Sequence, residues 1–273
     1  MWLVLLFYII LVSALIWKSL TLYHNQLTSL PAEIGQLTNL QHLNMSSNFL
    51  ELLPSEIGQL ANLHELFLTG NYLKTLPTEI GQLHNLQNLT LTNNRLVMLP
   101  PEMGQLKNLQ WIDLQENQLT ALPPDIGQLT LLEGLAVRHN LLTVVPREIS
   151  TLINLHDLYL DDNHLIYLPL EMGQMARLKV LTISSNPLTT IPNEILQIKS
   201  LEFINVSHTL ITVPEEVQQQ RPPTTLAYLR DYEAMLMRQT IAGIAAGVGG
   251  IAGLILAFRW RQRRGLREKK KRL

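Results

Sequence analysis

The sequence of 273 residues contains no cysteine and few aromatic side chains, which make up only 6% of the chain. The absence of cysteine excludes a fold held by disulfide bonds, and it excludes thiolate metal sites and redox sites. Export does not require disulfides, so a location outside the cytoplasm stays open. Because hydrophobic residues still reach 47%, the apolar content is mainly aliphatic.

Basic residues are scarce over most of the chain. Residues 1–258 hold 12 Lys and Arg against 21 Asp and Glu, a net charge of −9. Residues 259–273 hold nine Lys and Arg against Glu268, a net charge of +8. The overall charge of −1 is therefore a cancellation between an acidic chain and a basic tail.

An uncharged apolar run covers residues 241–258, which is about the shortest length that crosses a bilayer as a helix. Its five glycines would each cost a soluble helix about 1 kcal/mol, whereas membrane helices tolerate glycine better. We therefore predict a transmembrane helix at 241–258. The basic tail at 259–273 follows at once, so the positive-inside rule predicts that it is cytoplasmic and contacts anionic lipid rather than nucleic acid.

Four glycines of this span have the spacing that lets two helix backbones approach closely in lipid, namely Gly243 and Gly247, and Gly249 and Gly253. This spacing predicts self-association through the transmembrane helix. Glycine-rich spans also occur in monomers, so a monomeric span is the alternative.

A second apolar run covers residues 1–17 and ends before Lys18. It has three interpretations: a cleaved secretory signal, an uncleaved anchor, or a hydrophobic cap on the first structural repeat. The small residues Val12, Ser13 and Ala14 favour a cleavage site, while the absence of a basic residue ahead of the run speaks against a signal. We expect export to the cell membrane. Cleavage gives a single-pass protein with a cytoplasmic carboxyl terminus, and retention gives a two-pass protein.

Between these ends the chain repeats itself every 23 residues without a slip. The first leucine of each unit recurs at Leu27, Leu50, Leu73, Leu96, Leu119, Leu142, Leu165 and Leu188, with Ile211 in the same place. A proline and an asparagine recur with the same period. Such self-similarity indicates a stack of identical structural units rather than a single globular core.

Each position of the unit has a physical interpretation. Alternating apolar residues such as Leu66 and Leu68 predict a short strand that neighbouring units extend as a parallel sheet. The recurrent asparagine can satisfy backbone groups that the following turn leaves unpaired. The Leu-Pro step fixes φ where the return segment begins. Ile57, Leu60 and Leu63, three residues apart, predict a short helical or 3-10 face, and the glycine of IGQL predicts a turn.

The unit LxxLPxEIGQLxNLxxLxLxxN resembles the leucine-rich repeat, in the form seen in many bacterial arrays and in animal scribble-like and Ras-suppressor-like proteins. The match covers about residues 17–217, nearly three quarters of the chain. The resemblance implies an α/β solenoid, a horseshoe with a parallel concave sheet and a short helical or 3-10 convex side, which chiefly binds other macromolecules. It says little about which ones.

The predicted organisation has five parts: a hydrophobic signal or anchor segment (1–17), the solenoid (18–217), a capping or stalk helix (218–240), the transmembrane helix (241–258) and the basic tail (259–273). The last unit is irregular, because Thr209 replaces the recurrent asparagine. In the capping helix we expect Leu226, Leu229 and Leu236 to form the buried side.

Partner specificity must lie in the variable strand positions that face away from the core. Aligned by period, three central strands carry aromatic side chains, one arginine and several acids around Gly134 and Ala136, which leave a floor without large side chains. This combination is typical of a protein-binding hot spot, although ordinary variation with Arg138 neutralising acids is the alternative. We call these residues the candidate patch: Trp111, Asp113, Gln115, Glu116, Arg138, His139, Asp157, Tyr159, Asp161 and Asp162.

The sequence offers no support for catalysis. The histidines have no metal-binding spacing, GVGG lies inside the predicted span, and no GxSxG motif occurs. A cation held by Asp157, Asp161, Asp162 and His139 is less favoured than a solvated acidic surface. We therefore expect no enzyme, no cofactor and no metal. The favoured function is a membrane-anchored recognition or adhesion module that binds a protein or peptide outside the cytoplasm; the alternative is a cytoplasm-facing scaffold that recruits signalling proteins.

Overall fold

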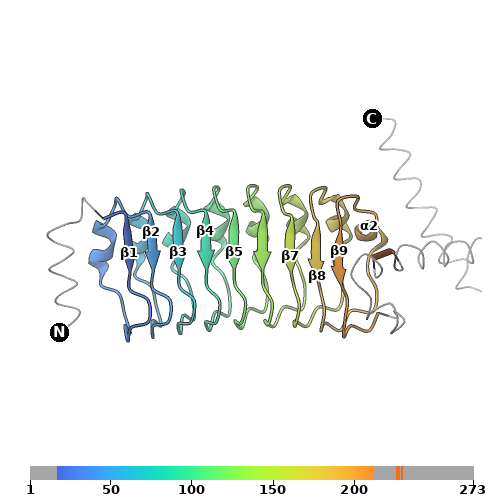
Figure 1. Cartoon of the computed structure of the whole chain (residues 1–273), viewed down its shortest axis with the longest axis horizontal. Helices are drawn as coiled ribbons and strands as arrows, with labels where there is room; N and C mark the ends of the chain where they lie inside the picture. Colours follow the sequence, from blue (N-terminus) through green and yellow to red (C-terminus); the bar gives the residue numbers. More distant parts are fainter. Residues whose placement is uncertain (1–16, 212–225, 228, 230–273) are drawn as a thin grey trace, which may run out of the picture.

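The computed structural model describes residues 17–211, 226, 227 and 229, and these form a solenoid with a parallel sheet along one side (Figure 1). Nine strands of three residues each pair in sequence order, so every unit adds one strand beside the previous one. The strands are β1 (Ser19–Thr21), β2 (His42–Asn44), β3 (Glu65–Phe67), β4 (Asn88–Thr90), β5 (Trp111–Asp113), β6 (Gly134–Ala136), β7 (Asp157–Tyr159), β8 (Val180–Thr182) and β9 (Phe203–Asn205).

Short helices line the side opposite the sheet (Figure 1). Seven of those along the solenoid are 3-10 helices, and the eighth is a single α-helical turn. They are η1 (Ala32–Gln36), η2 (Ser55–Gln59), η3 (Thr78–Gln82), η4 (Pro101–Gln105), η5 (Pro124–Gln128), η6 (Arg147–Thr151), η7 (Leu170–Gln174) and α2 (Asn193–Leu196). The prediction of a parallel sheet facing a 3-10 side is confirmed.

The core lies between the two sides and is built from the repeated apolar positions. In the second unit, for example, Ile57, Leu60, Leu63, Leu66 and Leu68 have no exposed surface. Each helix begins directly after a proline with φ between −74° and −55°, so the Leu-Pro step does fix the start of the return segment. The spacing of three matches the 3-10 geometry, in which residues i and i+3 lie on one side.

The recurrent asparagines form a buried ladder that joins each unit to the one before it. The Nδ2 group of Asn117 donates to the carbonyl oxygens of Leu91 and Leu114, both at 3.0 Å, while its Oδ1 accepts a hydrogen bond from the backbone N–H of Leu96 at 3.0 Å. The same bonds recur in the neighbouring units. The amide thus satisfies turn groups that have no strand partner, as the sequence predicts.

The glycine of the IGQL segment serves close packing rather than a turn, which corrects the prediction. A β-carbon at Gly104 would lie 2.5 Å from the carbonyl oxygen of Asp125 in the next unit. The glycine is favoured because the helices of successive units touch through their backbones. Ser150 takes its place in η6, and Leu196, which is 2% exposed, takes its place in α2.

The two ends of the solenoid differ from its middle. Trp17 packs partly buried against the first unit, and Leu226 and Leu229 are buried in the same core as the repeats. Thr209 replaces the ladder asparagine, and its hydroxyl bonds to Val206 (2.7 Å) and Ile211 (3.3 Å), neither of which lies in the preceding unit. The ladder therefore ends where the sequence becomes irregular.

Among the described residues, no helix is both long enough and apolar enough to span a bilayer. The predicted signal or anchor segment (apart from Trp17), the predicted transmembrane helix with its four glycines, and the basic tail lie outside the described residues. So does Leu236.

Candidate binding site on the open face of the sheet

The strand register brings the candidate patch together on the side of the sheet that points away from the core, here called the open face. Gly134 of β6 pairs with Trp111 of β5 on one side and with Asp157 of β7 on the other. Ala136 likewise lies between Asp113 and Tyr159. The period of 23 residues alone predicts this alignment.

The Trp111 ring covers the floor that the sequence predicts at Gly134, so this floor is not open. Its six-membered ring occupies the space that a β-carbon at Gly134 would fill, with Cζ3 and Cε3 as the nearest atoms. The ring therefore lies over β6, and Gly134 is buried beneath it. Because Trp111 is only partly buried, part of the indole stays open to solvent. A glycine beside a tryptophan in the register is the signal that could have revealed this arrangement.

Arg138 is held inside the candidate patch by two contacts. Its Nε atom lies 2.9 Å from Oδ2 of Asp161, an ion pair that lacks hydrogen-bond alignment, and its guanidinium carbon lies 4.2 Å from the centre of the Tyr159 ring. Cation–π stacking and a carboxylate together fix this side chain, which is 35% exposed. The arginine thus has its charge neutralised by the protein itself.

Asp161 is the most buried acid of the candidate patch, at 6% exposure. Besides Arg138 it accepts hydrogen bonds from the hydroxyl of Thr182, from the backbone N–H of Ser184 at 3.0 Å and from the Ser184 hydroxyl at 2.6 Å. Sequence reasoning missed Thr182 and Ser184, although both occupy aligned positions on the next unit. Asp161 is therefore a structural anchor for Arg138 rather than a free binding group.

Tyr159 has a pKa above its ordinary value. Burial is the main cause, and the negative charge of Asp157 adds to it, while Arg138 acts in the opposite direction and Asp161 raises the pKa further. The phenol is therefore neutral at physiological pH and offers a hydroxyl beside the stacked guanidinium.

The remaining members of the candidate patch make local contacts. Asp113 accepts hydrogen bonds from the backbone N–H and the side-chain amide of Gln115, at 3.1 and 3.0 Å. Glu116, His139 and Asp162 occupy the position with positive φ that follows each strand, at 53°, 51° and 52°. Nδ1 of His139 lies 3.5 Å from the Asp162 carboxylate, and both side chains are exposed. These three form a rim at the edge of the sheet.

The described part of the chain contains no group of three or more acidic or histidine side chains placed to hold a metal ion. The arrangement is instead suited to binding a polypeptide of complementary shape, because it combines a partly exposed tryptophan, a stacked tyrosine and several carboxylates on a rigid sheet. Backbone hydrogen bonds between neighbouring strands fix the positions of these residues, so the arrangement exists without a ligand.

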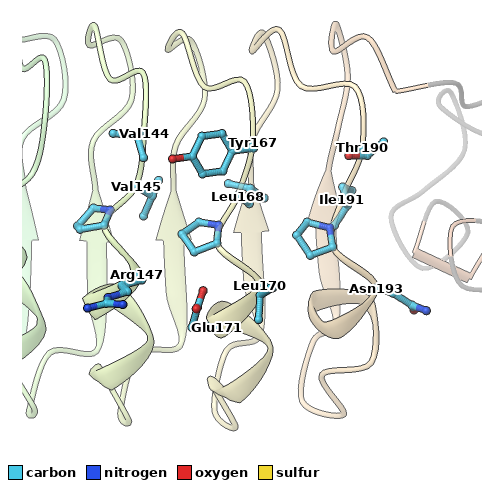
Figure 2. A pocket seen from close by; sticks show the side chains of 13 residues that line it. Val144, Val145, Arg147, Tyr167, Leu168, Leu170, Glu171, Thr190, Ile191 and Asn193 are labelled. Atoms are coloured by element: carbon cyan, nitrogen blue, oxygen red, sulfur yellow. The ribbon is translucent and has the colours of Figure 1, made fainter. Parts of the chain in front are cut away.

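A separate groove of about 630 Å³ lies on the flank of the solenoid. Figure 2 shows that equivalent residues of three successive units line it in rows, with Val144, Tyr167 and Thr190 in one row and the helix-starting prolines nearby. Tyr167 and Leu170 are 54% and 51% exposed. Sequence reasoning did not identify this groove, because its residues are spread over three units.

Comparison with known proteins agrees with the repeat pattern. A family model described as leucine-rich repeat region matches residues 11–94 and 56–140, and one described as leucine-rich repeat matches residues 153–211. A search of curated proteins finds no match.

Solved structures are similar over most of the described solenoid. A leucine-rich repeat protein of Leptospira interrogans is 42% identical, with a TM-score of 0.58, over 73% of this chain and 57% of that one. The leucine-rich repeat ectodomain of the Arabidopsis thaliana membrane receptor kinase GASSHO1/SCHENGEN3, solved in complex with Casparian strip integrity factor 2, is 29% identical, with a TM-score of 0.62, over 72% of this chain and 28% of that one. The functional domain of InlJ from Listeria monocytogenes shares the fold at 23% identity, with a TM-score of 0.61, over 75% of this chain and 42% of that one. The chain thus spans less than two thirds of each of these proteins.

Proposed function

The chain belongs to the leucine-rich repeat family, and we propose that it is a membrane-anchored recognition module that binds a protein or peptide through the candidate patch outside the cytoplasm. Domains of this family bind protein ligands. The observation that carries the proposal is the preformed patch, in which Trp111 lies over Gly134 beside the Arg138–Tyr159 stack. In the patch, two aromatic side chains and the Arg138–Asp161 ion pair lie on three successive units of the open face.

Two comparisons support the proposed role. The Arabidopsis relative is the ectodomain of a membrane receptor kinase and was solved with a bound factor. The Leptospira relative, at 42% identity, is likewise a leucine-rich repeat protein. Together they favour recognition over catalysis.

The membrane location is proposed from the sequence. The uncharged run at 241–258 has the length of a transmembrane helix, and nine basic residues follow it. With the basic tail in the cytoplasm, a single span puts the solenoid on the opposite side. If the first 17 residues also span the membrane, both ends lie in the cytoplasm and the solenoid stays outside.

The absence of cysteine provides a direct test of this topology. Thr75→Cys on the exposed surface of the solenoid and Gln262→Cys in the basic tail each give a chain with a single thiol. A membrane-impermeant maleimide should label Thr75→Cys on intact cells and Gln262→Cys only after permeabilisation. The reverse pattern would favour the cytoplasm-facing scaffold. Sequencing the mature amino terminus separates the single-pass from the two-pass form.

Binding is tested by comparing capture of extracellular proteins by the full chain and by variants of the open face. Trp111→Ala combined with Tyr159→Ala should abolish capture of the ligand while changing thermal stability little, because both rings are partly exposed. Phe67→Ala is the matched control, since Phe67 is a partly buried aromatic residue on β3 of the same sheet. Capture that survives the double variant, or that is lost equally in the control, refutes the patch.

A further inference from the structure

We propose that Trp111 and Asp157 form a seat for a lysine or arginine side chain, so that the ligand of the candidate patch is a cationic polypeptide segment. This inference rests on the proposed function and deepens it by naming the chemistry of the partner. Its basis is the geometry and the charge of three adjacent strands.

The seat is created by the missing side chain at Gly134. The Trp111 ring crosses from β5 to lie over Gly134 on β6, and the next residue in the register is Asp157 on β7. Adjacent strands are about 4.8 Å apart, and two such spacings separate Trp111 from Asp157. Because the ring lies over Gly134, it crosses the gap between β5 and β6, and the gap between β6 and β7 remains. A partly exposed aromatic ring and a carboxylate thus lie side by side on the open face.

The carboxylate of Asp157 has no hydrogen bond or ion pair within the part of the chain that the structure describes, whereas its backbone N–H donates to the carbonyl oxygen of Glu133 at 3.1 Å. Asp157 is only partly exposed, and its charge is felt by Tyr159 on the same strand. The one arginine nearby, Arg138, is paired with Asp161 and stacked on Tyr159, so it does not neutralise Asp157. A partly buried carboxylate without a counter-ion is stabilised when a cation arrives.

The surroundings strengthen the preference for a cation. Asp113 lies two residues from Trp111 on β5. Its carboxylate accepts hydrogen bonds from Gln115, whose amide groups are neutral, so the negative charge of Asp113 remains. In each unit, four positions face outwards, which in the β5 unit are Trp111, Asp113, Gln115 and Glu116. Over the whole open face these positions carry one arginine, Arg138, and six acids: Glu65, Asp113, Glu116, Asp157, Asp161 and Asp162. An acidic ligand would be repelled, whereas a basic one is attracted before contact.

A lysine or arginine fits this seat in two ways at once. The guanidinium or ammonium group is attracted to the face of an indole ring, and its aliphatic stem covers the ring's apolar surface. The charge then reaches the carboxylate of Asp157. A bare metal ion lacks the stem, and among the described residues no cluster of ligands suits one. The seat therefore selects a side chain rather than an ion.

The test uses the full chain in detergent and a fluorescein-labelled peptide of alternating arginine and serine. A peptide with citrulline in place of arginine has the same shape without the charge. We expect the arginine peptide to bind about tenfold more tightly than the citrulline peptide, and salt to weaken its binding. Asp157→Asn and Trp111→Leu should each weaken binding of the arginine peptide about five- to tenfold.

Glu202→Gln is the matched control, because it removes the same charge from an exposed residue next to β9, two strands from Asp157. We expect it to change affinity by less than about twofold, as a distant screened charge should. Equal losses in Glu202→Gln and Asp157→Asn would show steering by net charge alone and overturn the seat.

The inference and the proposed function fail in different ways. If the arginine peptide binds no better than the citrulline peptide while Trp111→Ala with Tyr159→Ala still abolishes partner capture, the cation seat is wrong and the patch stands. If the peptide behaves as expected but partner capture ignores the double variant, the seat exists and the proposed partner site lies elsewhere.

Discussion

Replacing Asn117 by alanine should destabilise the solenoid far more than replacing Asn25, although both are ladder asparagines. Asn117 is buried within the array, whereas Asn25 belongs to the partial unit before Leu27 and is exposed. Asn25 donates only to the carbonyl oxygens of Leu22 and Tyr23, at 3.0 and 3.1 Å. Within the described residues, no N–H group donates to its Oδ1.

The magnitude follows from which groups are left without a partner. The carbonyl oxygens of Leu91 and Leu114 keep one bond each, because the ladder asparagines of neighbouring units also donate to them. The N–H of Leu96 has the Asn117 side chain as its partner and would be buried without one. One orphaned donor costs about 1–3 kcal/mol, and the two weakened acceptors add about 1 kcal/mol, so Asn117→Ala should cost about 2–4 kcal/mol. Asn25→Ala should cost less than about 1 kcal/mol.

Urea unfolding followed by far-ultraviolet circular dichroism measures both variants, and amide hydrogen exchange shows where the loss occurs. Exchange of the Leu96 amide should accelerate in Asn117→Ala, because that amide loses its acceptor, and stay unchanged in Asn25→Ala. If the two variants lose the same stability, or if Leu96 keeps its protection, the ladder does not act through the buried N–H and the argument is wrong.

Three further outcomes are expected. Asp161→Asn should lower the free energy of unfolding in urea by about 1–3 kcal/mol, because it leaves buried donors and Arg138 without their carboxylate. Asp162→Asn, at the exposed neighbouring residue, should lower it by less than about 0.5 kcal/mol. Equal losses would contradict the role of Asp161 as an anchor for Arg138. In alkaline titration at 295 nm, the difference between wild type and Tyr159→Phe should show a midpoint above about pH 10, because burial raises the pKa of Tyr159. Since the pKa is higher in the folded state than in the unfolded state, the contribution of Tyr159 to stability is present below about pH 10 and declines as the pH rises through the raised pKa. A midpoint at or below about pH 10 would contradict this. Gly104→Ala should lower stability by about 1–3 kcal/mol through contact with the next unit's backbone, and an unchanged melting temperature would show that the helices can separate freely.

The repeat made most of the fold predictable. A strict period fixes which residues pair, so the strands, the 3-10 helices, their proline starts and the asparagine ladder all follow from one unit. The glycine of IGQL was misassigned to a turn, because its role depends on how closely two units approach, which a single unit does not contain. Gly104 shows this through its contact with Asp125.

The candidate site was predictable only in part. The register of Trp111, Gly134 and Asp157 follows from the period, but the tilt of the indole over Gly134 depends on space that opens only when neighbouring side chains are placed. The burial of Asp161 under Thr182 and Ser184 likewise depends on the next unit. The membrane span and the basic tail remain predictions from the sequence.

The uniform register also makes the units interchangeable. Each strand begins by bonding to the same position of the previous unit: the N–H of Glu65 donates to Gln41, and that of Asn88 donates to His64. Removing residues 65–87 would therefore let Asn88 meet Gln41 through an equivalent bond. The array can be shortened or lengthened in steps of one strand spacing, about 4.8 Å, without redesigning any joint. The length of the open face is thus a quantity that duplication or loss of whole units can set.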